Sequence, residues 1–188
     1  MINTHAKLML LSIIIASLFS SSVLYAEAKN KYSRYVDSQG EITFPEGFQT
    51  SMVHLGSWYV PEGDASGFHD VYTEKESVKA FRKTGEFPDG ATLVKVLRES
   101  SSGGYTTGAN VNYATSEIKQ WFVMVKDAKQ HFPGNSQWGD GWGWALFKPS
   151  NTDQNVVKDY TADCLGCHIP ARDQDWVYTE AYPLLRPE

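Results

Sequence analysis

Short, mostly apolar stretches recur along the chain between polar segments and predict β-strands. They are rich in β-branched and aromatic residues, and Gly, Pro, Asn and Ser separate them. Together they predict an α+β domain, built mainly from a β-rich antiparallel sheet with a few short helices. The stretches are residues 51–60, 91–100, 117–127, 141–149 and 175–182.

Residues 74–84 have the spacing of apolar residues that is typical of a helix, with Val78 on the inward face. Thr73 precedes this segment and Glu76 follows three residues later, which is the pattern of a capping box. Gly85 supplies a C-terminal stop, because glycine readily adopts the left-handed conformation that ends helices. We therefore expect one clear helix between the predicted strands.

Lys95 interrupts the apolar strand predicted over residues 91–100. The alternation places Lys95 with Leu93 and Leu97 on one face and two valines on the other, so both faces look buried. An unpaired ammonium is costly to bury and tends to lose its proton, and a neutral amine is a nucleophile. The alternative is that Lys95 lies on an edge strand and extends to solvent.

The first residues have the pattern of a secretory signal peptide, which we assign to residues 1–26. Lys7 supplies the positive start, residues 8–19 are almost entirely apolar, and Ala26 and Ala28 form an Ala-x-Ala site. The apolar run is too short to span a membrane. An uncleaved membrane anchor is the alternative. Cleavage predicts an exported protein that is not membrane-bound.

Residues 27–43 are polar or lack periodicity and predict a flexible leader, so the domain is expected over residues 44–188. Removing the signal peptide takes away one of the 17 basic residues and none of the 22 acidic residues, which gives a net charge of 16 − 22 = −6. A nucleic-acid partner would require a basic face, and this balance argues against one.

The two cysteines of the chain lie close together near its end, in Cys164-Leu165-Gly166-Cys167-His168. In an exported protein, CxxCH is the attachment pattern of a c-type haem. The two thiols bond to the porphyrin vinyl groups, and the histidine that follows can bind the iron through Nε2. We therefore predict covalent haem c held by Cys164 and Cys167, with His168 as the proximal ligand.

Other interpretations of the cysteine pair are weaker. A thioredoxin-like dithiol would open a helix within a βαβ unit, which the pattern does not predict. A zinc site would need more ligands at motif spacing, and the chain has no other cysteine. A chance match is the third alternative, and the predicted export argues against it.

The second axial position of the iron has no obvious ligand. No Met or His follows His168, so a ligand would have to come from upstream. Each upstream candidate is more readily explained as structural, and we therefore expect a five-coordinate iron that is open to small molecules. The upstream candidates are Met52, Met124, His54, His69 and His131.

Several segments in the same order resemble the cytochrome P-460 family over roughly residues 44–187. The resemblance implies a periplasmic mono-haem c-type protein with a β-rich fold, commonly a homodimer. The segments that carry it are RKTGEFPDGATLVKV (82–96), FVMVKDAK (122–129), WGWALF (142–147), CLGCH (164–168), DWVY (175–178) and YPLL (182–185).

The resemblance implies a specific role for Lys95. In the enzymes of the family, a lysine at the matching position is bonded to a haem meso carbon, and the modified haem oxidises hydroxylamine to nitric oxide and nitrous oxide. A soluble cytochrome would accept the electrons. The related cytochrome c′-beta proteins lack the bond and bind nitric oxide, which is the alternative function. A plain electron-transfer cytochrome is the third possibility.

Two further residues are candidates for the site. Hydroxylamine oxidation needs a proton acceptor near the iron, and we predict Asp163, next to Cys164, for this role; the alternative is an ordinary acid at a helix start. His69 is predicted to meet a haem propionate or to line the pocket. The alternative for His69 is a satisfied polar bridge within the fold.

Overall fold

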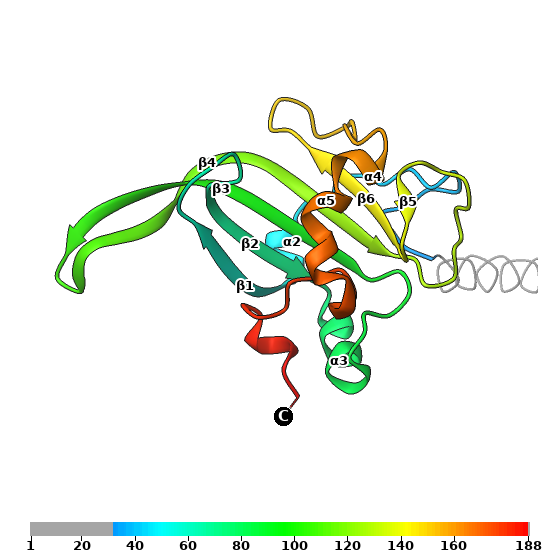
Figure 1. Cartoon of the computed structure of the whole chain (residues 1–188), viewed down its shortest axis with the longest axis horizontal. Coiled ribbons are helices and arrows are strands. Elements are labelled where there is room, and N and C mark those ends of the chain that lie inside the picture. Colours follow the sequence, from blue (N-terminus) through cyan, green and yellow to red (C-terminus); the bar gives the residue numbers. More distant parts are fainter. Residues whose placement is uncertain (1–31, 188) are drawn as a thin grey trace, which may run out of the picture. The chain divides into compact units, whose positions relative to one another are not determined.

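Six antiparallel strands form a sheet in the order β1-β2-β3-β4-β6-β5 (Figure 1). The computed structural model describes residues 32–187, and the sheet belongs to the unit Tyr35–Glu188. This architecture confirms the predicted α+β fold with a β-rich antiparallel sheet. The strands are β1 (Val53–Val60), β2 (Gly67–Thr73), β3 (Thr92–Tyr105), β4 (Gly108–Lys126), β5 (Trp138–Gly139) and β6 (Trp142–Phe147).

Strand β2 was missed from the sequence, although its burial alternates regularly along the strand. The other long strands lie on predicted stretches. β3 and β4 extend well beyond the predicted residues, and their ends form a hairpin that projects past the neighbouring strands (Figure 1). The hairpin is polar and largely exposed, so hydrophobic periodicity did not reveal it.

The strand predicted over residues 175–182 is wrong. Asp175 and Trp176 have φ angles of 57° and 63°, which lie in the left-handed region and are incompatible with a strand. The segment turns instead, and Trp176, Val177 and Tyr182 enter the core. Trp176 and Tyr182 are therefore buried without pairing with a strand, because the turn directs them into the core.

Helix α3 (Lys75–Thr84) confirms the predicted helix, and Gly85 ends it with φ 81° as expected. The capping box is wrong. Thr73 ends strand β2, where its hydroxyl donates to the carbonyl oxygen of Thr92 at 2.8 Å. The N-cap is Glu74, whose carboxylate accepts from the backbone N–H of Thr92 at 3.0 Å and therefore ties the helix start to β3.

Different segments cover the two faces of the sheet. On one face lies α2 (Phe48–Ser51), where Phe48 packs on Tyr72 with ring centroids 5.2 Å apart. The other face, which carries Leu93 and Trp144, forms a core with the C-terminal segment. Figure 1 shows α5 crossing the sheet on this side. The C-terminal helices are α4 (Tyr160–Asp163), α5 (Leu165–His168), η1 (Ile169–Gln174) and η2 (Pro183–Leu185).

The predicted leader, residues 27–43, is partly ordered. Val36 and Ile42 form a β-bridge and are buried, and the indole N–H of Trp138 donates to the carbonyl oxygen of Gly40 at 2.7 Å. These contacts tie residues 36–42 to the rest of the unit, and the flexibility of the leader stays a prediction. The signal peptide predicted over residues 1–26 lies outside the described residues. Within residues 32–187, no helix has the length and apolar character needed to cross a membrane.

Gly56 lies where β1 meets the C-terminal segment, and we predict that Gly56→Ala destabilises the fold. A Cβ at this position would lie 2.0 Å from the carbonyl oxygen of Ala181. The backbone would have to move apart, and we expect a loss of about 1–3 kcal/mol in the free energy of unfolding. Chemical denaturation measures this loss. Gly104→Ala is the control, since no atom lies within 4 Å of its Cβ; equal stability of the two variants would contradict the prediction.

Candidate haem site

The CxxCH motif lies on α5, over the face of the sheet that carries the core. Cys164 is the N-cap of this helix and is partly buried, with Leu165 beside it against the core. Cys167 is exposed, and its backbone N–H donates to the carbonyl oxygen of Cys164 at 3.3 Å. Both cysteines are free thiols. The turn therefore presents two thiols, one at the core boundary and one toward solvent.

His168 is held by a hydrogen bond between its Nδ1 and the carbonyl oxygen of Trp176 at 2.8 Å. A carbonyl can only accept, so Nδ1 carries the proton and Nε2 keeps its lone pair. Burial, with a smaller contribution from the charge of Lys95, lowers the pKa of His168 to about 4. The ring packs edge-on against Trp144 with centroids 4.9 Å apart. A neutral, oriented imidazole of this kind is suited to bind a metal.

Lys95 lies in β3, between β2 and β4, where it is opposite Val71 and Phe122. This central position excludes the edge-strand alternative. Its Nζ lies 4.1 Å from the centroid of the Phe122 ring, and it has no hydrogen bond or ion pair within residues 32–187. Burial lowers the pKa of Lys95 to about 8. The amine is thus close to its neutral, nucleophilic form at mildly alkaline pH.

Lys95 and the CxxCH motif face each other. The charge of Lys95 lowers the pKa of Cys164 and of His168, and thiolate charge on Cys164 or Cys167 would raise the pKa of Lys95. Burial nevertheless raises the pKa of Cys164 to about 12, so this thiol is protonated. The fold therefore brings a strand from the middle of the chain to a helix near its end.

His69 lies in β2 on the same face of the sheet as Lys95. It pairs with Leu97, two residues along β3 from Lys95, and the charge of Lys95 contributes to its lowered pKa, for which burial is the main cause. Nε2 lies 2.7 Å from the carbonyl oxygen of Ala65, so Nε2 carries the proton. His69 is thus a satisfied polar bridge at the border of the site, and its contact with haem stays a prediction.

Asp163 has a structural role at the start of α4. Its carboxylate accepts from the backbone N–H of Lys158 at 2.8 Å and of Asp159 at 3.2 Å. The Asp159 carboxylate in turn accepts from the backbone N–H of Thr161 at 2.9 Å and caps the helix. These bonds hold the chain just before Cys164. They correspond to the ordinary helix-start alternative, and the predicted role of Asp163 as proton acceptor stays untested.

The upstream candidates for a second iron ligand have surroundings that explain them without iron. Met124 is buried in the core opposite Leu93, and Met52 is buried after α2. His54 shares a hydrogen bond of 3.2 Å with Ser57, and His131 one of 2.6 Å with Asp127. The open axial position stays a prediction, and these environments agree with it.

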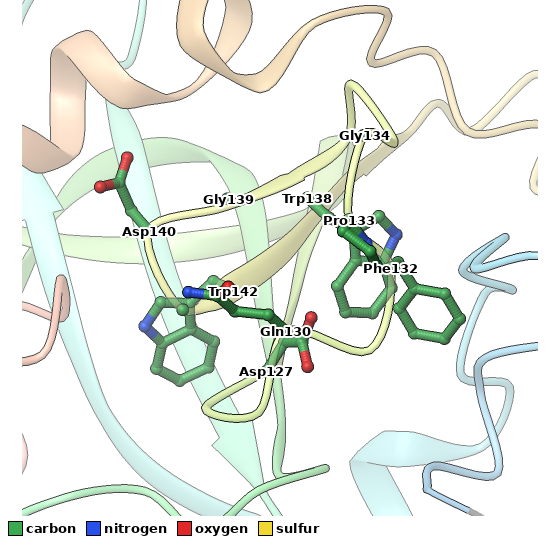
Figure 2. A pocket seen from close by; sticks show the side chains of 10 residues that line it. Asp127, Gln130, Phe132, Pro133, Gly134, Trp138, Gly139, Asp140 and Trp142 are labelled. Atoms are coloured by element: carbon green, nitrogen blue, oxygen red, sulfur yellow. The ribbon is translucent and has the colours of Figure 1, made fainter.

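A hollow of about 580 Å³ beside the loop after β4 was not expected from the sequence (Figure 2). Asp127 lines it and lies with Asp89 and His131 in a group whose ligand atoms are within 4.8 Å of one another. Hydrogen bonds and ion pairs within this group, and the ion pair of Asp89 with Lys129, explain why these side chains lie close together. We assign no function to it.

The described residues around α5 fit a haem. These residues comprise two free thiols at CxxCH spacing, of which Cys164 borders the core, a neutral imidazole with a free Nε2, and a partly buried amine without a polar partner. An amine is costly to bury without a partner, and a bond to a porphyrin edge would remove that cost. The fold and the site thus define a haem-binding β-sheet protein.

The comparison with protein families agrees with this class. The Cytochrome P460 family model matches residues 45–179, which is most of the chain and includes Lys95 and the CxxCH motif. The chain therefore belongs to the cytochrome P460 family, as the sequence segments predicted, and is a haem cytochrome. A comparison with curated proteins gave no match.

Proposed function

We propose that this cytochrome oxidises hydroxylamine to nitric oxide and nitrous oxide at a single covalent haem c. The observation that carries the proposal is the position of Lys95, a partly buried amine that faces the CxxCH motif and has no polar partner among residues 32–187. Cys164 and Cys167 would attach the haem, and His168 would bind its iron through Nε2. Lys95 would be bonded to a meso carbon of the porphyrin, in a bond that replaces one amine N–H and the meso C–H and whose formation requires an external two-electron oxidant.

The bound haem would supply one-electron transfer and an iron that binds a small nitrogenous ligand. The chain would orient and protect it. Trp144 and the hydrogen bond to Trp176 hold the His168 ring, and Phe122 covers the Lys95 amine. Oxidation of hydroxylamine releases protons and electrons, and a soluble cytochrome would accept the electrons.

We also propose a periplasmic location and a homodimer. The signal-peptide pattern of residues 1–26 and the family support the location, and the family supports the dimer. Amino-terminal sequencing of protein from the periplasmic fraction should show cleavage at the Ala-x-Ala site formed by Ala26 and Ala28. Sedimentation of the purified protein should give twice the mass of one chain, and a monomer at micromolar concentration would contradict the assembly.

Steady-state turnover tests the proposed activity. We expect purified holoprotein to consume hydroxylamine with an artificial electron acceptor, and its resting ferric spectrum to be high-spin because the iron is open on one side. Binding of nitric oxide without turnover of hydroxylamine would contradict the proposal and favour a protein that only binds nitric oxide. A low-spin resting spectrum that responds slowly to ligands would favour an electron-transfer cytochrome.

A further inference from the structure

The orientation of His168 depends on a single backbone carbonyl. The only hydrogen bond of its ring within residues 32–187 goes to the carbonyl oxygen of Trp176, at 2.8 Å. A hydrogen bond at Nδ1 makes an imidazole a stronger electron donor through Nε2. The position of the Trp176 carbonyl therefore affects any metal bound at Nε2.

That carbonyl belongs to an unusual turn. Asp175 and Trp176 are consecutive non-glycine residues with φ angles of 57° and 63°. The left-handed conformation is unfavourable for residues with a Cβ and persists where surrounding contacts hold it. The turn ends η1, and the N–H of Trp176 donates to the carbonyl oxygen of Ala171 at 2.9 Å.

The contacts that hold the turn converge on Asp175. Its carboxylate forms an ion pair with Lys126 of β4 and accepts from the backbone N–H of Phe87 at 3.3 Å. Its carbonyl oxygen accepts from the indole N–H of Trp142 at 3.0 Å. The side chains of Lys126 and Asp175 are only 10% and 12% exposed, so water screens their attraction weakly.

The position of Lys126 in the sheet supports its ion pair with Asp175. Lys126 and Trp142 are opposite each other on the neighbouring strands β4 and β6, and the Lys126 Nζ lies 4.9 Å from the Trp142 ring centroid. Lys126 thus binds the carboxylate of Asp175, and the neighbouring Trp142 binds its carbonyl oxygen. A continuous set of contacts leads from the sheet through Asp175 and Trp176 to His168.

We propose that the Lys126–Asp175 ion pair positions the Trp176 carbonyl and thereby sets how strongly His168 donates to the haem iron. Lys126 and Asp175 are positioning residues that touch neither haem nor substrate. The inference rests on the proposed function, because it requires His168 to be the proximal ligand. Loss of the pair weakens the Nδ1 hydrogen bond, which lowers the electron donation of the imidazole and raises the reduction potential of the iron.

Asp175→Asn and Lys126→Met test the proposal in the holoprotein. Asparagine tolerates the left-handed conformation, so Asp175→Asn removes the charge and leaves the turn possible. Lys126→Met removes the charge and keeps most of the apolar stem. In both variants we expect the iron–histidine stretching band of the ferrous protein to shift to lower wavenumber and the reduction potential to rise. The double variant should add little to either single variant, because the two residues act as one unit.

Asp173→Asn is the matched control, because Asp173 is an exposed acid of η1 two residues before Asp175. It removes the same charge at a similar place and should shift neither signal. Lys126→Arg should keep the wild-type values. If Asp175→Asn and Lys126→Met match Asp173→Asn in both measurements, the proposal is wrong. If those two variants do not fold, Trp142→Phe decides, since it removes the indole N–H donor to the Asp175 carbonyl, together with part of the ring, and should shift both signals in the same direction.

The wild-type protein separates failure of this inference from failure of the proposed function. Absence of an iron–histidine band in the ferrous wild type would show that the iron is not a five-coordinate, high-spin centre with His168 as its axial ligand, and would overturn the proposed function. A normal wild-type band that none of the charge or Trp142 variants shifts would leave His168 as the ligand and overturn the positioning role alone.

Discussion

Lys95→Leu should lower the rate of hydroxylamine oxidation by about 100-fold, which corresponds to about 2.7 kcal/mol in activation free energy. The variant should carry an ordinary c-type haem and still bind nitric oxide. Leucine cannot form a bond to the porphyrin, whereas the Lys95 amine, without a polar partner and facing the CxxCH motif, is placed to do so. Steady-state kinetics, the reduced pyridine spectrum and peptide masses measure these effects.

In the wild type, we expect a proteolytic peptide with Lys95 joined through the porphyrin to the peptide with Cys164 and Cys167. Lys95→Arg should lack this link, because a guanidinium stays protonated and is not nucleophilic. Lys79→Leu, which removes an exposed lysine of α3, should behave as the wild type. Identical pyridine spectra and peptide masses in the wild type and Lys95→Leu would refute the bond and favour the nitric-oxide-binding function.

The reduced activity of Lys95→Leu should not result from unfolding. Replacing a partly buried amine that has no ion pair by an apolar side chain removes a desolvation cost. In the haem-free proteins, where no bond to the porphyrin offsets this cost, we therefore expect the variant to unfold at the same or a higher denaturant concentration than the wild type. A much less stable variant would mean that Lys95 acts mainly through the fold.

Replacing both Cys164 and Cys167 by Ala should abolish covalent haem attachment. The wild-type band should keep its haem stain after denaturing electrophoresis, and the double variant should lose it. The spectrum of the purified double variant should show at most loosely bound haem, because only His168 then holds the iron. The sheet should still form, since Cys167 is exposed and Cys164 is only partly buried.

Gly166→Ala is the matched control for the cysteine variants. Gly166 lies between the two cysteines, and no atom is within 4 Å of a Cβ at this position. The substitution keeps the spacing of both thiols, so we expect full haem attachment. Haem that acid-acetone extracts from the wild-type protein would show that CxxCH is not an attachment site here.

Local sequence patterns were sufficient to predict the antiparallel sheet and to find the thiols and the imidazole of the candidate haem site. Enrichment in β-branched and aromatic residues between turn-forming residues marked β1, β3, β4 and β6, because these side chains favour strands wherever they occur along the chain. The spacing of Cys164, Cys167 and His168 is likewise set along the chain. The same local reasoning failed for residues 175–182, whose apolar and aromatic residues look strand-like although they form a turn.

The capping interactions show the same limit. Thr73 and Glu76 have capping-box spacing, but the hydroxyl of Thr73 bonds across the sheet to Thr92. A side chain that has a partner on a neighbouring strand is not available for the helix start. Asp163 was proposed as a proton acceptor because of its neighbour Cys164, and its hydrogen bonds to backbone N–H groups became visible only in the folded chain.

Residue order alone led to the β-rich fold, the family and the CxxCH motif, since these depend on neighbours in the chain. The folded structure alone showed that Lys95 lies on a central strand facing the motif. It also showed that Lys126 forms an ion pair with Asp175, in the turn that binds His168. These contacts join residues far apart in sequence. They arise from strand register and from a turn held by its surroundings, and burial across the whole sheet, not any local pattern, determines both.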